Sequence, residues 1–476
     1  MTQAIGRTHE IAALNKYYKS NKAEFVAVYG RRRVGKTFII RNTLEQHFTF
    51  YFSGVIKVKQ AQHLANFNEK LLAYSQGIVT DKVPENWFEA FKQLETYLKQ
   101  CKQQKKVIFI DELPWLDTPK SDFVPALDYF WNSWASTRKD MLLIVCGSAA
   151  SWMINTLLND KGGLHNRLTQ RIKLQPFTLL ECEAFFKQKG SFYTRYQLIQ
   201  LYMAFGGIPF YLDQIDVSQS VAQNIDNLCF TQTGLLRTEF KNLYASLFKK
   251  SEKYVAIIEA LATKLKGLSR AELIALTKLT NGGNTTKILK ELEENDFIRT
   301  YNSFDKLGRD KTYQLIDFYS LFYLRFIKNS ILTDTNYWLN NLDNPSLRAW
   351  SGYAFEQVGL WHLDNIKKAL GISGIQTKTS AWSTQHKPIN AQIDLVIDRR
   401  DQVINLCEMK FGIDEYIITK DYAAVIKNKI AAFKETTKTK KAICFTMLTS
   451  FGLKQNGYTD MLVQKSLTMD VFFEKV

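Results

Sequence analysis

The chain has 476 residues, of which 46% are hydrophobic and 13% aromatic, enough apolar material for several packed cores. This length predicts about three domains, and the composition excludes an intrinsically disordered protein. The six cysteines are scattered without CxxC pairs, as expected for reduced thiols rather than a metal site. No apolar run approaches the ~18 residues of a membrane span, and the first residues form no apolar targeting segment. We therefore expect a cytoplasmic protein with no membrane partner.

Basic residues outnumber acidic residues by 63 to 46, which gives a formal net charge of +17. A positive protein attracts polyanions, so this charge favours nucleic acid as a partner. The excess is spread along the chain, and no single arm or tail carries it. Charge alone therefore leaves open the alternative of a generally basic protein without a nucleic-acid partner.

A glycine-rich loop follows the first predicted strand. Residues 25–29 form a short apolar run rich in strand formers, and residues 38–44 have a helical pattern. Between them lies G-x-x-x-x-G-K-T, in the strand–loop–helix context that this motif requires. Its glycines let backbone N–H groups surround phosphates, and the helix start adds a favourable dipole. The sequence therefore predicts an ATP site. The predicted nucleotide contacts are Gly30, Arg31, Arg32, Arg33, Val34, Gly35, Lys36, Thr37 and Phe38.

Two side chains of the loop and two later acids account for the predicted chemistry. Lys36 can reach the β- and γ-phosphates, and the Thr37 hydroxyl can hold Mg²⁺. A second apolar run, 105–110, ends in Asp111 and Glu112. We expect Asp111 to hold the water shell of Mg²⁺ and Glu112 to orient or deprotonate the attacking water. The set predicts ATP hydrolysis as well as ATP binding.

Five motifs resemble those of one known group. They are Ile5-Gly6-Arg7-x-x-Glu10, the loop 30–37, Asp-Glu-Leu-Pro-Trp at 111–115, Cys-Gly-Ser-Ala at 146–149, and Gly-Gly-Ile-Pro at 206–209. Together they resemble the prokaryotic ATPases of the AAA+/STAND class, often called archaeal-type ATPases. In that class a third strand lies between the strand that leads into the glycine-rich loop and the strand that ends in the acids, and a polar residue at its end senses the γ-phosphate. The resemblance implies this role for Ser148, which follows the predicted strand 141–147.

The resemblance also implies residues farther along the chain. A Gly-x-Pro turn of a helical lid packs near the adenine, which makes Gly207 and Pro209 lid contacts. An arginine near the γ-phosphate is expected from the segment 164–171, as Arg167 or Arg171. Which arginine acts, and whether it acts within its own subunit, stays open. The loop arginines 31–33 could equally be trans-acting or solvated.

The middle of the chain predicts a winged helix. Three helices are expected: the first at 254–261, the second opened by an S-x-x-E capping box at 269–272, and the third at 285–294. Two strands follow, at 297–301 and 312–316, with a turn at 306–309 between them. Its third helix offers Asn284, Thr286, Lys287 and Lys290 to a phosphate backbone, but Glu291, Glu293 and Glu294 would repel DNA. Direct DNA contact and an intramolecular lid therefore remain alternatives. An aromatic helix at 317–326 is expected to be a packing hinge.

A β-hairpin with acidic residues is predicted near the C-terminus, from strands at 391–398 and 403–410. Glu408 and Lys410 are two residues apart in a strand, so they point to one face, and Asp394 can face them from the neighbouring strand. Two carboxylates can bind Mg²⁺, while the lysine steadies or deprotonates a water.

Glu356, in a helix expected to open at Gly352, could complete this metal site. The ordered set Glu356, Asp394, Glu408 and Lys410 looks like the PD-(D/E)xK nuclease fold, and it also resembles the domain fused C-terminally to archaeal-type ATPases. One departure is Ile393, where many members have proline. Solvated hairpin charges, or a relative that has lost cleavage, remain alternatives.

The whole chain predicts an α/β protein with a P-loop NTPase parallel sheet (1–180), a helical lid (181–245), a winged helix (246–320) and a restriction-endonuclease-like α/β domain (321–476). We expect an ATP-driven, DNA-directed switch protein that uses ATP and Mg²⁺ and carries a nuclease-like domain. The alternative is an ATP-dependent regulatory scaffold whose C-terminal domain binds an unknown protein partner without cleavage. A nucleotide-dependent oligomer is left open.

Overall fold

The computed structural model describes residues 4–158, 167–302, 304, 311–330, 336–384 and 391–476. The chain divides into two compact units, Met1–Pro176 and Phe177–Val476, and each is described by itself. In the described parts of both units, no helix is long and apolar enough to cross a membrane. All six cysteines are free thiols, as predicted.

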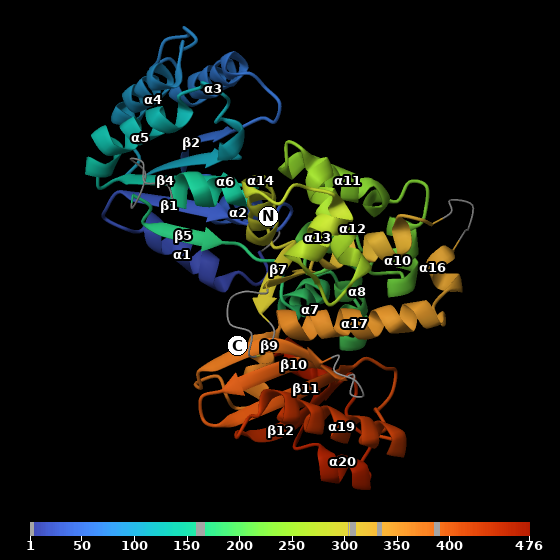
Figure 1. Ribbon diagram of the computed structural model, residues 1–476. Helices are drawn as coiled ribbons and strands as arrows, with labels where there is room; N and C mark the ends of the chain where they lie inside the picture. Colours follow the sequence, from blue (N-terminus) through green and yellow to red (C-terminus); the bar gives the residue numbers. More distant parts are fainter. Residues whose placement is uncertain (1–3, 159–166, 303, 305–310, 331–335, 385–390) are drawn as a thin grey trace. The chain divides into compact units, whose positions relative to one another are not determined.

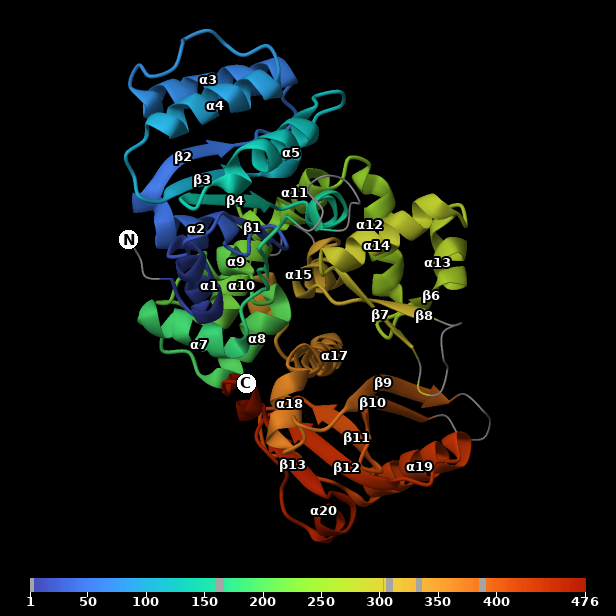
Figure 2. The same ribbon diagram turned by 90° about the vertical axis from the view of Figure 1, so that its left-hand side faces the viewer.

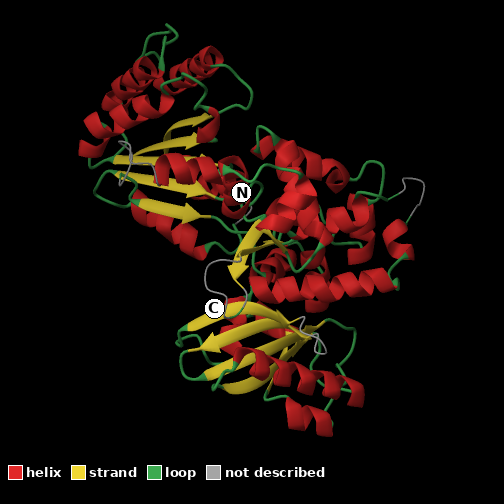
Figure 3. Ribbon diagram, viewed as in Figure 1, coloured by secondary structure: helices red, strands yellow, loops and turns green. Residues whose placement is uncertain are grey.

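The first unit is built on a five-stranded parallel sheet (Figures 1 and 3). The strands are β1 (Glu24–Tyr29), β2 (Phe48–Ser53), β3 (Lys106–Asp111), β4 (Met141–Gly147) and β5 (Gln170–Lys173). Their order is β2-β3-β4-β1-β5, and every neighbouring pair is parallel. The predicted third strand, β4, therefore lies between the other two. Because parallel strands end at one edge, the segments that follow β1, β3 and β4 converge there.

Helices cover both faces of this sheet, which is why β1, β3 and β4 are almost continuously buried and apolar. The helices are α1 (Thr8–Tyr18), α2 (Lys36–Leu44), α3 (Gln60–Ser75), α4 (Trp87–Gln100), α5 (Phe123–Ser133) and α6 (Ala150–Trp152). Figures 1 and 2 show α3, α4 and α5 over one face and α1 over the other. Aromatic rings fill the core under α3 to α5, with Trp87 against Phe67 and Phe123. The unit is thus a mixed α/β layer structure consistent with a P-loop NTPase fold.

The second unit begins with five helices: α7 (Leu179–Gln188), α8 (Arg195–Phe205), α9 (Pro209–Asp213), α10 (Val221–Cys229) and α11 (Leu235–Leu247). Capping boxes open α7, α8 and α10, with Thr178, Thr194 and Ser220 as the capping residues. This local chemistry explains why so many short helices begin where they do.

Three helices and a small antiparallel sheet follow: α12 (Ser251–Thr263), β6 (Leu268–Ser269), α13 (Arg270–Thr277), α14 (Gly283–Glu294), β7 (Ile298–Asn302) and β8 (Lys311–Leu315). The sheet order is β6-β8-β7. The capping box of Ser269 and Glu272 is present as predicted. The predicted turn at 306–309 lies outside the described residues.

A helical segment then leads to the last sheet: α15 (Phe318–Phe322), continued by a π-helical turn (Tyr323–Ile327), then α16 (Tyr337–Asn340), α17 (Pro345–Trp361) and α18 (Leu363–Ala369). The prediction that the helix carrying Glu356 opens at Gly352 is wrong. The helix begins at Pro345, because proline suits a first helical position and the Asn344 side chain accepts a hydrogen bond from the Ser346 N–H. Glu356 therefore lies in the second half of α17.

The C-terminal sheet has the order β13-β12-β11-β10-β9. The elements are β9 (Thr377–Thr384), β10 (Ala391–Arg399), β11 (Val403–Lys410), α19 (Lys420–Thr437), β12 (Ala442–Thr449), α20 (Gly457–Leu462) and β13 (Lys465–Thr468). The predicted hairpin is β10 and β11, which pair antiparallel, while β11, β12 and β13 are parallel. Figures 1 and 2 show α17 and α19 on opposite faces of this sheet.

Candidate functional site

The glycine-rich loop joins β1 to α2 at the carboxyl edge of the first sheet. Gly30 has φ +140°, and a Cβ there would lie 2.3 Å from the carbonyl oxygen of Leu174, just after β5. Leu174 in turn donates its N–H to the carbonyl of Tyr29. This close approach of two backbones requires glycine at the first position of the loop. Gly35, with φ +89°, precedes the first residue of α2.

Lys36 is the first residue of α2 and is 5% exposed. Its Nζ donates to the carbonyls of Gly30 and Arg31, at 3.0 and 2.9 Å, so the side chain folds back over the loop. Burial lowers the pKa of this ammonium, and the nearby acids Glu112 and Asp111 oppose that shift. The arrangement places a desolvated positive charge inside the cradle where phosphates would bind.

Thr37 and Asp111 meet across the sheet edge. The Thr37 hydroxyl donates to Asp111 Oδ2 at 2.8 Å, which joins the start of α2 to the end of β3. Burial raises the pKa of Asp111, and the hydrogen bond from Thr37 opposes that shift. The pair brings together a hydroxyl and a carboxylate, the oxygen ligands that Mg²⁺ uses in nucleotide sites.

Glu112 is held by the residue that follows β4. The Ser148 hydroxyl donates to Glu112 Oε1 at 2.7 Å, and the Ser148 N–H donates to Oε2 at 3.3 Å. Glu112 itself has φ 47° and ψ 42°, a left-handed conformation that is uncommon for residues other than glycine. Ser148 thus orients this carboxylate in addition to any contact with a phosphate that the resemblance implied.

The other predicted loop contacts differ in exposure. Arg31 and Val34 are buried, at 3% and 1% exposed, while Arg32 and Arg33 are half-buried and Phe38 is exposed. Burial of Arg31 argues against the alternative that all three arginines are merely solvated. Arg33 adopts a positive φ of 71° within the turn.

Arg167 and Arg171 are both exposed, Arg171 on the edge strand β5. Residues 164–166 of the segment predicted to supply an arginine lie outside the described residues. The positive charge of Arg167 acts on Asp128 of α5, where it opposes the rise in pKa that burial causes. The choice between Arg167 and Arg171 stays a prediction.

Gly207 and Pro209 belong to the second unit, at the turn between α8 and α9. A Cβ on Gly207 would lie 1.9 Å from the carbonyl oxygen of Phe177, whose N–H donates to the Gly207 carbonyl at 2.6 Å. Pro209 is the first residue of α9. The glycine is therefore required by packing inside this unit, and the predicted adenine contact stays a prediction.

Two of the four predicted nuclease residues share one lysine. Lys266, between α12 and β6, forms ion pairs with Glu356 Oε2 and, at 3.5 Å, with Asp394 Oδ1. Asp394 Oδ2 also accepts the N–H of Met409 in β11, at 3.1 Å. Burial raises the pKa of Glu356 to about 7, with the Asp394 charge as the next cause.

The other two, Glu408 and Lys410, have partners on α19. Glu408 is fully buried and accepts from Lys429 at 2.6 Å, from Tyr422 at 3.2 Å and from Lys410 at 3.5 Å. Burial raises the pKa of Glu408, and the charge of Asp394 adds to that shift. The four residues therefore lie within electrostatic reach of one another but divide between two sets of partners.

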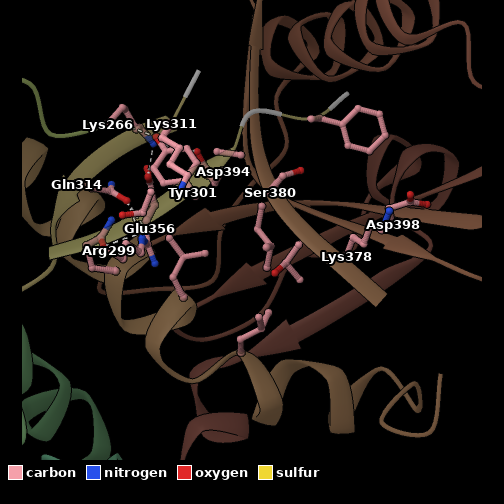
Figure 4. A pocket seen from close by; sticks show the side chains of 18 of the residues that line it. Lys266, Arg299, Tyr301, Lys311, Gln314, Glu356, Lys378, Ser380, Asp394 and Asp398 are labelled. Atoms are coloured by element: carbon pink, nitrogen blue, oxygen red, sulfur yellow. Dashed lines mark hydrogen bonds and ion pairs between the residues drawn. The ribbon is translucent and has the colours of Figure 1, made fainter. Parts of the chain in front are cut away.

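A cavity of about 750 Å³ opens over the first of these sets (Figure 4). Figure 4 shows Lys266, Glu356 and Asp394 directed toward one another at its wall. Among the residues that the structure describes, no three His, Cys, Asp or Glu side chains are grouped so that they could hold a metal ion. What the structure places at this wall is a pair of carboxylates, Glu356 and Asp394, that share the Lys266 ammonium.

Sequence reasoning missed Lys266, Tyr422 and Lys429. The last two have a detectable signal, because Tyr422 and Lys429 are seven residues apart in α19 and so lie on one face. Lys266 has no such signal, since it stands 90 residues from Glu356 and 128 from Asp394. Only the fold brings Lys266, Glu356 and Asp394 together.

Comparisons with known proteins agree with the geometry of the first unit. A family model described as an ATPase domain predominantly from Archaea matches residues 5–215. An uncharacterized protein of Methanocaldococcus jannaschii is 26% identical over 414 residues, covering 86% of this chain and 87% of that protein. An uncharacterized ATP-binding protein of the same organism is 44% identical over 41 residues, 9% of this chain and 70% of that protein.

Among solved structures, the Walker-type ATPase of Pyrococcus abyssi is similar with a TM-score of 0.50 and 14% identity, covering 68% of this chain and 96% of that one. At this identity the likeness shows the fold. The matched family model adds the activity. Residues 5–215 are thus similar to an ATPase domain that is described as predominantly from Archaea, and the chain is an ATPase.

Proposed function

We propose that ATP binds with Mg²⁺ in the loop 30–37 and is hydrolysed there. The observation that carries this proposal is the convergence of Lys36, Thr37, Asp111 and Glu112 at one sheet edge, through the hydrogen bonds described above. Thr37 and Asp111 would hold Mg²⁺, which supplies positive charge to the phosphates when bound. Lys36 would exchange its two backbone acceptors for phosphate oxygens.

In this proposal Glu112 orients the attacking water and accepts its proton. A carboxylate can do this only if it points steadily at one place, and the two hydrogen bonds from Ser148 supply that orientation. Ser148 is then a positioning residue for Glu112. The same hydroxyl remains available to respond to a γ-phosphate, as the resemblance implies.

The second part of the proposal is a DNA-directed switch with a nuclease-like C-terminal domain. Helices α12, α13 and α14 with the sheet β6-β8-β7 support the winged-helix interpretation of residues 246–320. The hairpin β10–β11, which carries Asp394, Glu408 and Lys410, supports the PD-(D/E)xK interpretation of residues 321–476. Asp394 and Glu408 would hold Mg²⁺, Glu356 would complete the metal site, and Lys410 would steady the water.

Two observations favour the alternative of a non-cleaving regulatory scaffold. Lys266 and Lys429 already neutralise the acids of the C-terminal site. On α14, Lys287 and Lys290 lie near Glu291 and Glu294, at 3.9 and 3.5 Å, which reduces the charge that this helix could offer to DNA. The ATPase activity is common to both alternatives, so DNA cleavage separates them.

Incubation of plasmid DNA with the full chain, ATP and Mg²⁺ or Mn²⁺ tests the nuclease-like part. We expect nicking by the wild type and its loss in Lys410→Ala. Lys427→Ala is the matched control, because Lys427 is an exposed lysine on α19. No nicking by the wild type, or equal nicking by Lys410→Ala, removes cleavage and leaves the scaffold.

A further inference from the structure

Lys266 comes from outside the C-terminal sheet and its helices but forms ion pairs with two of the predicted nuclease residues, Glu356 and Asp394. It belongs to the short segment between α12 and β6, yet its ammonium lies against Glu356 of α17 and Asp394 of β10. These two carboxylates are among the Mg²⁺ ligands proposed above. A lysine ammonium and a metal ion would use the same oxygens, so both cannot occupy this place together.

The ion pairs of Lys266 differ from those of Lys429. The Lys429 side chain is 17% exposed and reaches Glu408 from α19, which packs on the same sheet. The Lys266 side chain is 39% exposed and borders the cavity of about 750 Å³. The lysine therefore has room to leave the two carboxylates without any rearrangement of the C-terminal core.

The backbone of this segment is tied to the small antiparallel sheet. Tyr301 of β7 donates its hydroxyl to the carbonyl of Lys266, and Gln314 of β8 donates to the carbonyl of Leu265 at 2.9 Å. Tyr353 of α17 also donates to the Leu265 carbonyl, at 2.7 Å. A displacement of β7 and β8 relative to α17 would thus carry Lys266 with it and break the Tyr353 bond.

We propose that Lys266 is an internal cation that closes the Glu356–Asp394 site and competes with a divalent metal ion for it. The inference rests on the proposed function only in taking this acid pair as the metal ligands. The site is then self-inhibited, and it can bind a metal ion only when the sheet β6-β8-β7 moves and Lys266 leaves the two carboxylates. The wild type should therefore cut DNA more slowly than a variant that lacks the Lys266 charge.

Binding of Mn²⁺ to the nucleotide-free full chain, followed by electron paramagnetic resonance of the free ion, tests the proposal. Removal of the lysine charge leaves one buried carboxylate, Asp394, and one partly buried carboxylate, Glu356, without a compensating cation, which favours binding of a metal ion in its place. We expect Lys266→Met to bind Mn²⁺ at least about tenfold more tightly than the wild type. Lys266→Gln keeps N–H donors for both acids but no charge, so it should show the same gain and fold even if the methionine variant does not.

Three control variants test whether a gain in Mn²⁺ affinity comes from loss of the Lys266 charge beside Glu356. Lys264→Met changes an exposed lysine two residues away that pairs with Glu272, and it should bind Mn²⁺ like the wild type. Lys266→Arg keeps the charge and should also behave like the wild type. Adding Glu356→Gln to Lys266→Gln should abolish the gain.

The outcomes separate the closure by Lys266 from DNA cleavage. Equal Mn²⁺ affinity of wild type and both neutral variants, or a gain that persists with Glu356→Gln, overturns the closure. A gain in affinity without nicking supports the closure and removes cleavage. Nicking by the wild type as fast as by Lys266→Gln overturns the closure while cleavage stands.

Discussion

The contact between Ser148 and Glu112 makes a quantitative prediction about catalysis. Ser148→Ala removes the hydroxyl that donates to Glu112 Oε1 at 2.7 Å but keeps the weaker N–H bond at 3.3 Å. The carboxylate should remain near its place but lose its fixed orientation. We therefore expect a lower turnover number with little change in nucleotide affinity.

The size of the effect follows from the type of bond. A hydrogen bond to a charged group is worth about 1.5–3 kcal/mol. If that bond acts fully in the transition state, its loss lowers turnover about ten- to hundredfold, at ~1.4 kcal/mol for each factor of ten. Loss of the water-activating carboxylate in Glu112→Gln should cost more, about 10²–10⁴-fold.

A double-mutant cycle separates orientation from an independent role. In a Glu112→Gln background, Ser148→Ala should cost less than about threefold, because the carboxylate that it orients is absent. The assay is steady-state phosphate release at saturating ATP, with nucleotide affinity measured in parallel. Ser133→Ala, which removes an exposed hydroxyl on α5, is the matched control. Fully additive losses would refute the positioning role, and an unchanged turnover in Ser148→Ala would do the same.

Two further predictions concern stability, measured as the thermal midpoint of the second unit's unfolding. Gly207→Ala forces a Cβ to 1.9 Å from a backbone oxygen and should lower the free energy of unfolding by about 3 kcal/mol. The control is Gly352→Ala in α17, where a Cβ would meet no atom within 4 Å, so this change should be neutral or stabilising. Equal thermal midpoints of the two variants would contradict the packing argument. His362 accepts the Leu179 N–H at Nε2, and burial lowers its pKa from 6.5 to about 4. The neutral His362 ring stabilises the folded chain fully above pH 6.5. As the pH falls toward 4, the unfolded chain binds the proton first, so the free energy of unfolding decreases by up to about 3 kcal/mol. His362→Gln should flatten this dependence, and an unchanged pH profile would contradict it.

Local sequence signals predicted the elements that carry the ATP site. The strand–loop–helix at 24–44 and the acids after β3 follow from patterns within a few residues, and so do the capping box of Ser269 and the hairpin β10–β11. Each of these signals reflects chemistry between near neighbours in the chain. Their mutual position at one sheet edge then follows from the parallel topology.

The rest depends on contacts between distant segments. The predicted start of α17 at Gly352 is wrong because the helix is opened farther upstream, where Asn344 caps it and Pro345 is its first residue. The ion pairs of Lys266 with Glu356 and Asp394 were not predictable, because an ion pair carries no periodicity when its partners lie in different elements. The E-x-K pattern therefore predicted the hairpin and its acids but not the charges that surround them.

The most direct test of the ATP site is calorimetric titration of ATP with and without Mg²⁺, alongside phosphate release, for wild type and Lys36→Ala. Lys19→Ala, an exposed lysine just after α1, is the control. We expect Mg²⁺-dependent binding and hydrolysis by the wild type and by Lys19→Ala. Because Lys36 would donate charge-assisted bonds to phosphate, Lys36→Ala should bind about a hundredfold more weakly and release no phosphate. Hydrolysis by Lys36→Ala at the wild-type rate would contradict the placement of the nucleotide in the loop 30–37.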